Sequence, residues 1–176
     1  MSTTTPAAPT ARTVTPGRVA AVVVCLGLAL LWIYVLTQRP ERVAGTLTDP
    51  AFAQAAQPIC LATVQRLAEL PQAFEVPDGA ARADVVEASD VELAAMLDRL
   101  EAVAPTEGED AAMVREWLDD WRTHLGDRAD YARRVRVDGS ARFYVTAKDR
   151  DQITDPIDHF AEVNRMPACA TPGDLG

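Results

Sequence analysis

Residues 110–135, DAAMVREWLDDWRTHLGDRADYARRV, carry a wide apolar face at helical spacing. Large apolar residues recur there every three or four positions, which is the pattern of one buried side of an α-helix. They are Val114, Trp117, Leu118, Trp121, Leu125 and Tyr131. Because only Gly126 interrupts the face, we predict that this helix is central to the fold.

Two more helices are predicted before it in the chain. From about Ala80 to Val103, apolar residues again recur at helical spacing, at Val86, Leu93, Met96, Leu97 and Leu100. An earlier helix is expected to begin at Pro58 and to end before Pro71, since proline fits the first turn of a helix. Its inward side chains would be Cys60, Val64 and Leu67.

The last predicted helix has Asp155 as its N-cap and Pro156 at its first position, and it ends before Pro167. Residues 142–146 have strand-like composition without an evident partner, so an extended loop is expected there. Four helices joined by short connections predict an all-α fold, a small bundle of about four helices.

An uncharged apolar run extends from Val19 to Gln38, between Arg18 and Arg39. A helix of about 20 residues is about 30 Å long, which matches the hydrocarbon thickness of a bilayer. The run exceeds the apolar part of a signal peptide, and no Ala-x-Ala cleavage site follows it. We therefore predict a transmembrane helix over residues 18–38, with the lipid bilayer as its partner.

This segment divides the sequence into four predicted parts. Residues 1–17 are rich in Ser, Thr, Pro and Ala and are expected to be disordered. Residues 39–50 are expected to form a tether, and residues 51–176 a single helical domain. Acidic residues are absent before the apolar run but soon follow it. This charge asymmetry predicts a single-pass plasma-membrane protein with a cytoplasmic N-terminus and an extracytoplasmic domain.

Two of the three cysteines, Cys60 and Cys169, lie near the two ends of the predicted domain. We predict a disulfide between them, and such bonds persist outside the cytoplasm. Closing a loop of about 100 residues stabilises a fold by about 4–5 kcal/mol in the chain-entropy model. A redox-active pair is disfavoured, because the spacing is not Cys-x-x-Cys.

Charge limits the possible partners. All 26 acidic residues and 15 of the 17 basic residues follow residue 38, which gives that part a formal net charge of −11. Nucleic acids and anionic lipids are bound by cationic surfaces. The composition therefore argues against nucleic acid as a partner.

Two groups of residues are candidate binding sites. Trp117, Trp121 and Tyr131 could line a pocket for an apolar or aromatic ligand, although core packing explains them equally well. Asp120 precedes His124 by four residues, and Asp155 precedes His159 by four, so each pair shares a helix face. If the two helices faced each other, the four side chains could hold a transition metal. Solvated surface pairs are the favoured interpretation, and neither a metal nor another cofactor is predicted.

Residues in the second half of the chain resemble a family pattern. They are Trp117-Leu118-Asp119-Asp120-Trp121, Asp127-Arg128, Tyr131-Ala132 and Phe160-Ala161, with Asn164, Met166 and Cys169. The pattern resembles single-pass membrane proteins of GC-rich Gram-positive bacteria for which no activity is established. The resemblance implies architecture and location, and it assigns no catalytic residues.

The sequence contains no recognisable phosphate loop, metal motif or nucleophile paired with a base. We therefore predict a non-catalytic binding or scaffolding module of the cell envelope, contacting another envelope protein or a cell-wall component. The alternative is a sensor or carrier of a small molecule or metal, with its site inside the helical bundle. An enzyme ranks third, because catalytic groups from distant positions leave no mark in one sequence.

Overall fold

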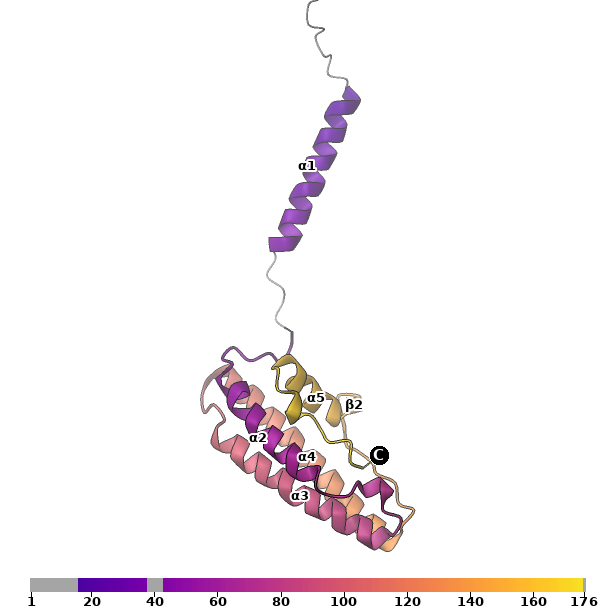
Figure 1. The fold of residues 1–176 in the computed structure, drawn as a ribbon. Coiled ribbons are helices and arrows are strands. Elements are labelled where there is room, and N and C mark those ends of the chain that lie inside the picture. Colours follow the sequence, from indigo (N-terminus) through magenta and orange to yellow (C-terminus); the bar gives the residue numbers. More distant parts are fainter. Residues whose placement is uncertain (1–15, 38–42, 176) are drawn as a thin grey trace, which may run out of the picture. The chain divides into compact units, whose positions relative to one another are not determined.

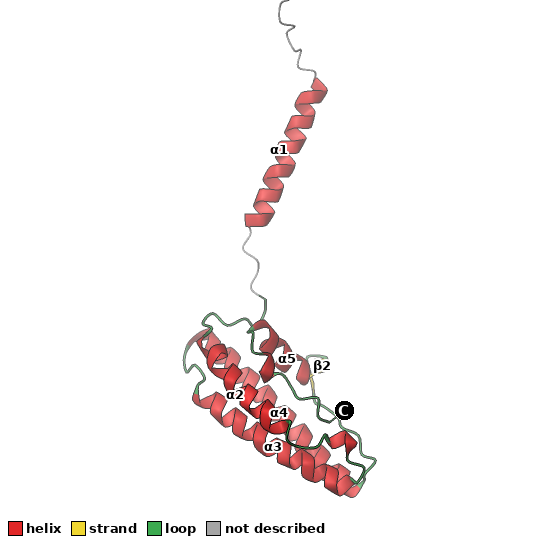
Figure 2. Ribbon diagram, viewed as in Figure 1, coloured by secondary structure: helices red, strands yellow, loops and turns green. Residues whose placement is uncertain are grey.

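The computed structural model describes residues 16–37 and 43–175 (Figure 1). The chain divides into two compact units, one ending at Arg42 and one beginning at Val43. The first contains the helix α1 (Pro16–Thr37). The second contains α2 (Ala51–Leu67), η1 (Ala73–Glu75), α3 (Gly79–Ala102), α4 (Gly108–Val137), β1 (Ala147–Lys148), β2 (Asp151–Gln152), α5 (Thr154–Val163) and η2 (Pro167–Cys169). Helices dominate the described residues, so the predicted all-α class is confirmed (Figure 2).

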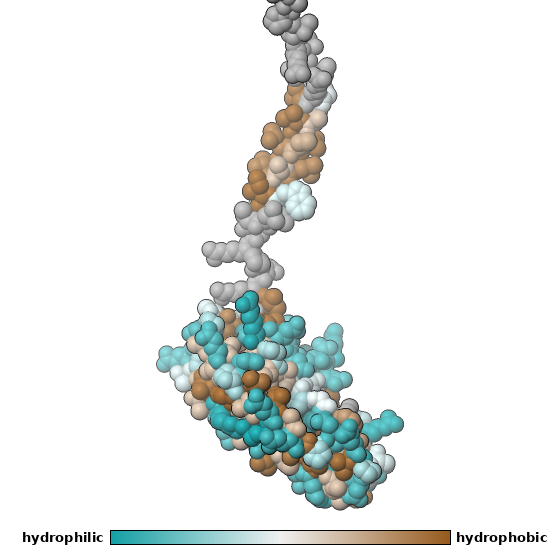
Figure 3. Space-filling view, in the orientation of Figure 1, coloured by the Kyte–Doolittle hydropathy of each residue, from teal (hydrophilic) through white to brown (hydrophobic). Residues whose placement is uncertain are grey.

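The described side chains of α1 are apolar and exposed, as its brown surface shows (Figure 3). Among the residues that the structure describes, no helix combines the length and the apolar character needed to cross a membrane. The transmembrane helix over residues 18–38 is therefore not confirmed and stays a prediction. Residues 1–15 of the predicted tail and residues 39–42 of the predicted tether lie outside the described residues.

Helices α3 and α4 pack along each other and form the main support of the second unit (Figure 1). All five predicted stripe residues of α3 are buried, as are five of the six predicted residues of α4, with Leu125 partly buried. Asp78 caps the start of α3 by accepting a hydrogen bond from the Ala81 amide at 2.8 Å. The helical spacing read from the sequence therefore identifies the buried faces of both helices.

The buried residues form two clusters along this helix pair. The large core joins the later turns of α3 and the first half of α4 to α2, α5 and η2. The small core lies at the other end of the pair and consists of Ala73, Ala83, Val86, Tyr131, Ala132 and Val135. Next to the small core, Gly79 lies close to Gly139, because a Cβ added at Gly79 would lie 2.7 Å from the Cα of Gly139. A side chain at Gly79 would therefore require the backbone to shift.

The prediction that the helix α2 begins at Pro58 is wrong, because it begins at Ala51 and Pro58 lies inside it. Residues 51–57 read AFAQAAQ, and alanine has the highest intrinsic helix propensity. These first turns also bury Phe52, Ala53 and Ala56, which offsets the hydrogen bond lost at proline. The prediction that Val64 faces inward is also wrong, since it is 43% exposed.

Helix α5 begins at Thr154, with Ile153 in the N-cap position, so the prediction of Asp155 as N-cap is wrong. Asp155 lies in the first turn and accepts a hydrogen bond from the Gln152 amide at 2.9 Å. Residues 142–146 have no regular secondary structure, as predicted. A short hairpin, β1–β2, which was not predicted from the sequence, follows them.

The predicted disulfide between Cys60 and Cys169 is confirmed, with their Cα atoms 5.1 Å apart. Both residues are fully buried in the large core, so the bond connects α2 to η2. Residues 43–50, assigned to a tether by the sequence, belong to the second unit. For example, the Leu47 amide donates to Asn164 Oδ1 at 2.8 Å, and the Asp49 amide donates to Asp110 at 2.9 Å.

Candidate functional site

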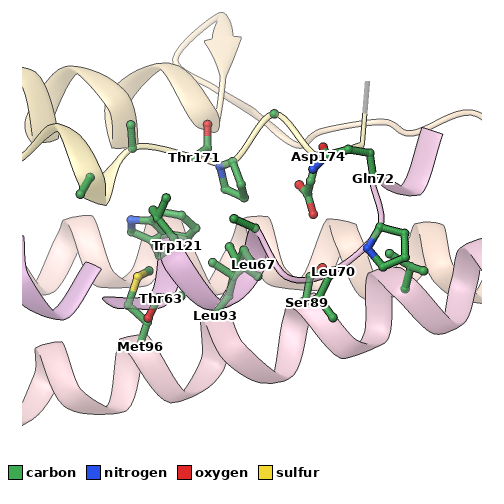
Figure 4. A pocket seen from close by; sticks show the side chains of 18 of the residues that line it. Thr63, Leu67, Leu70, Gln72, Ser89, Leu93, Met96, Trp121, Thr171 and Asp174 are labelled. Atoms are coloured by element: carbon green, nitrogen blue, oxygen red, sulfur yellow. The ribbon is translucent and has the colours of Figure 1, made fainter. Parts of the chain in front are cut away.

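A pocket of about 480 Å³ lies between α2, α3 and the chain that follows η2 (Figure 4). From α2 and the turn after it come Thr63, Val64, Leu67, Ala68, Leu70, Pro71 and Gln72. From α3 come Val85, Ser89, Leu93 and Met96, and from α4 comes Trp121. The opposite wall consists of Pro167, Ala168 and residues 170–174. Small-molecule sites in proteins are typically concave, apolar and of about 300–1,000 Å³, so the pocket has the dimensions of one.

The floor of the pocket belongs to the large core. Trp121 is fully buried, and Leu93 and Met96 are 1% and 2% exposed. These side chains are fixed by their positions in the α3–α4 pair, because they also fill the interior between the helices. The mouth is formed by exposed residues of α2 and the turn after it, such as Val64 and Pro71. A ligand would therefore rest on a rigid floor beneath a less constrained rim.

The wall opposite α2 is the C-terminal segment, residues 170–175, which has no regular secondary structure. It is attached at two points. Thr171 donates from its amide and its hydroxyl to Asp158 on α5, at 2.7 and 3.1 Å. Asp174 accepts two hydrogen bonds from Arg128 on α4, at 2.7 and 2.8 Å. Figure 4 shows Thr171 and Asp174 across the pocket from Leu67 and Leu70. Side-chain contacts therefore hold this wall in place.

Arg128 is completely buried and is the centre of a polar cluster with Ser89, Asp90 and Asp174. Its Nε donates to Asp90 Oδ1 and its Nη2 donates to Ser89 Oγ, both at 2.5 Å. Burial lowers the pKa of Arg128, but hydrogen bonds and charge from Asp174 and Asp90 outweigh it, so the pKa is raised. A guanidinium with carboxylates on two sides is the arrangement in which a charge can be buried.

The charges of this cluster do not balance, because the carboxylates of Asp90 and Asp174 share the single guanidinium of Arg128. Burial is the largest cause that raises the pKa of Asp90 above its ordinary value, and Arg128 acts in the opposite direction. The negative charge of Asp174 raises this pKa further. Asp90 Oδ2 is buried without a hydrogen-bond partner. The cluster therefore has a surplus of negative charge.

The two tryptophans of α4 differ in their hydrogen bonding. Trp117 Nε1 donates to the Ile157 carbonyl at 3.1 Å, and its ring stacks on Phe160 at a centroid distance of 5.2 Å. Trp121 Nε1 is buried and has no hydrogen-bond partner. A buried donor left unsatisfied costs about 1–3 kcal/mol. Trp117 is therefore fully accounted for by packing, whereas Trp121 retains an unused donor beside the pocket.

The structure separates the three residues predicted to line a pocket. Trp121 lines the pocket described above, but Trp117 lies in the large core between Phe52 and Phe160. Tyr131 lies in the small core, with its ring 5.6 Å from that of Phe143. The three residues share one helix face and are nevertheless spread along its length, so they do not form one site.

The weak metal candidates on α4 are engaged in other contacts. Asp120 accepts from Lys148 Nζ at 2.8 Å, which ties β1 to α4. His124 is 2% exposed and lies against the rings of Trp121 and Phe143, with neither ring nitrogen hydrogen-bonded. Burial, followed by the charge of Arg128, lowers the pKa of His124 to about 4. His124 is therefore neutral at physiological pH.

The weak metal candidates on α5 also have other contacts. Asp155 caps the Gln152 amide, and His159 Nε2 lies 3.3 Å from the Ala44 carbonyl oxygen. Among residues 16–37 and 43–175, no group of three or more His, Cys, Asp or Glu side chains could hold a metal ion. The four candidates are therefore not brought together in the part of the chain that the structure describes.

Sequence reasoning missed the polar part of the pocket. Arg128 was noted only as part of the Asp127-Arg128 pair in the family resemblance, and Ser89 and Asp174 were not singled out. One signal was available, because Arg128 lies at position i+7 from Trp121 and therefore on the apolar face of α4. A charged residue on such a face is buried only with partners, and those partners come from distant positions.

The fold and the pocket together define a helical-bundle domain closed by a disulfide, with a ligand-sized cavity beside a buried ion-pair cluster. Comparison with known protein families, characterised proteins and solved structures finds no match for this chain. The resemblance seen in residues 117–169 is not tested by this result and stays a prediction.

Proposed function

We propose that residues 43–175 form a non-catalytic binding module whose ligand is a small, mainly apolar molecule held in the pocket beside Trp121. The observation that carries this proposal is the cavity of about 480 Å³ on a floor of buried apolar side chains. This function corresponds to the alternative predicted from the sequence, a sensor or carrier of a small molecule. Binding of an envelope protein or a cell-wall component stays a prediction from the sequence.

The rigidity of the pocket floor supports a ligand there. This floor is formed by side chains that the α3–α4 pair already holds in place, so little order would be lost on binding.

For the location, we propose attachment to the plasma membrane through residues 18–38, with the domain on the outer side. Support comes from the uncharged apolar run in the sequence, because a segment of this kind is stable in hydrocarbon. The disulfide between Cys60 and Cys169 also supports it, since such bonds persist in oxidising compartments. Protease digestion of intact cells tests this placement: a protected domain would contradict it.

Two methionines allow ligand binding to be measured by NMR in the full-length protein. Met96 lines the pocket, whereas Met113 does not and lies against the outside of the large core. The protein would carry methyl-labelled methionine, be reconstituted in phosphatidylcholine nanodiscs, and be titrated with decanol as a neutral apolar probe. We expect a saturable shift of the Met96 methyl signal and an unchanged Met113 signal.

A matched pair of variants on α2 provides the control. Val64→Trp places an indole at the mouth of the pocket, whereas Leu61→Trp places one at a similarly exposed position on the same helix, outside the pocket. We expect Val64→Trp to weaken the Met96 response at least about fivefold, because the entrance is filled, and Leu61→Trp to leave it unchanged. Equal responses in both variants, or no Met96 shift in the parent protein, would contradict the proposed function.

A further inference from the structure

The side chains that line the pocket carry charge of only one sign. Asp174 is the single charged residue among them, and neither lysine nor arginine is present. The other polar side chains of the lining are Thr63, Ser89, Thr171 and Gln72, together with the indole of Trp121. Along α3, Ser89 lies between Leu93 and Val85, so Ser89 and Asp174 form a polar patch that interrupts the apolar lining (Figure 4).

The charge behind this polar patch is negative. Asp174 and Asp90 both bind Arg128, so the three residues together have a formal charge of −1. The donors of Arg128 are directed at Ser89 and at these two carboxylates. The guanidinium is completely buried, so it presents no accessible surface to a ligand. A carboxylate or phosphate entering the pocket would therefore meet Asp174 and not the cation.

From this arrangement we infer that the ligand is an aliphatic amine, with its ammonium group at Asp174 and its hydrocarbon chain along Leu67, Leu93 and Trp121. The inference rests on the proposed function, since it names the class of molecule that the same pocket binds. An ammonium group would balance the surplus carboxylate, and its hydrocarbon chain would bury apolar surface. An anionic ligand of the same length would add a third negative charge to the cluster.

Three probes of equal chain length separate the effect of the head group from that of the chain. Full-length protein in phosphatidylcholine nanodiscs would be titrated at neutral pH with decylamine, decanol and decanoate, with the Met96 methyl signal as readout. We expect half-saturation by decylamine at about one tenth of the decanol concentration, and decanoate to bind more weakly than decanol. Subtracting the response of Val64→Trp removes partitioning of each probe into the bilayer.

The contribution of the carboxylate is tested with Asp174→Asn, which removes one negative charge from the polar patch. We expect the preference for decylamine over decanol, taken as the ratio of their half-saturation concentrations in the same variant, to fall from about tenfold to less than about twofold. Asp98→Asn is the matched control, because it changes net charge equally at an exposed position of α3 outside the pocket. Asp90→Asn lowers the charge of the same cluster without altering the lining and is expected to reduce the preference as well.

The outcomes distinguish this inference from the proposed function. Equal binding of decylamine and decanol, or a preference that survives both Asp174→Asn and Asp90→Asn, would overturn the amine assignment while the apolar site remained. Tighter binding of decanoate would overturn it in favour of an anionic ligand. If none of the probes shifts Met96, both the inference and the proposed function fail.

Discussion

The large core and the small core occupy opposite ends of the same helix pair and are built differently. The large core draws on four helices, contains both Trp117 and Trp121, and is crossed by the disulfide. The small core has six buried residues and depends on the close passage of Gly79 against Gly139. Between them lies a buried polar layer. It contains His124 and Arg128, which are one helical turn apart on α4. The pocket opens beside this layer, where the two cores meet.

The disulfide should account for the largest difference in stability between the large core and the small core. Replacing both Cys60 and Cys169 by alanine is expected to lower the free energy of unfolding by about 4–5 kcal/mol, because the bond closes a loop across 109 residues. Guanidinium unfolding measures the loss. Hydrogen exchange should accelerate first in α2 and η2, which the bond connects. Cys25→Ser is the control, since this exposed thiol is free and its removal should leave stability unchanged.

The polar layer between the cores should be the next most sensitive feature. Arg128→Met is expected to cost about 3–4 kcal/mol, because it leaves Asp90 and Asp174 without their buried counter-charge. Arg133→Met, which removes an exposed ion pair with Asp130 on the same helix, should change stability by less than about 1 kcal/mol. Urea unfolding compares the two variants. Equal losses of stability in the two variants would mean that the buried ion pairs of Arg128 contribute no more than an exposed pair.

The close passage beside the small core predicts opposite effects for two glycine substitutions. A Cβ at Gly79 would lie 2.4 Å from the Val135 carbonyl oxygen, so Gly79→Ala should destabilise by about 2–3 kcal/mol. Gly126→Ala meets nothing within 4 Å in the middle of α4 and should stabilise by about 0.5–1 kcal/mol. Thermal unfolding gives both signs. Stabilisation by Gly79→Ala would contradict this prediction and show that the backbone near Val135 and Gly139 shifts at little cost.

Below the Gly79→Ala effect comes a pH dependence from His124. Its pKa is lowered to about 4 in the folded protein, mainly by burial, so the unfolded chain binds the proton more strongly. Stability should therefore fall as the pH decreases below the ordinary histidine pKa, by about 2 kcal/mol between pH 7 and pH 5. The dependence should disappear in His124→Phe and persist in His159→Gln, whose imidazole is exposed. Both variants retain Asp90, so its titration cancels in the comparison.

Much of the helical fold followed from apolar spacing. The buried faces of α3 and α4 were identified because a period near 3.6 residues is a local property of the chain. The start of α2 was missed because Pro58 indicated a helix start, whereas burial of Phe52 and Ala56 extends the helix beyond it. Local rules thus failed where tertiary packing outweighed them.

The candidate site was predictable only in part. Trp121 was recognised as a pocket residue, but Ser89, Arg128 and Asp174 come together from three separate segments. One sequence does not reveal such a meeting, because ion pairing between distant residues leaves no periodic pattern. The disulfide was predictable because cysteine pairing has few alternatives in a chain with three cysteines.

The bond between Cys60 and Cys169 also affects how cleaved forms of this protein would behave. The irregular stretch after α4 includes Tyr144, which is 66% exposed, and such loops are preferred sites of proteolytic cutting. A single cut there would separate α5 and η2 from the rest of the backbone, yet the two fragments would stay covalently linked. They would migrate as one species on a non-reducing gel and part only after a reducing agent is added.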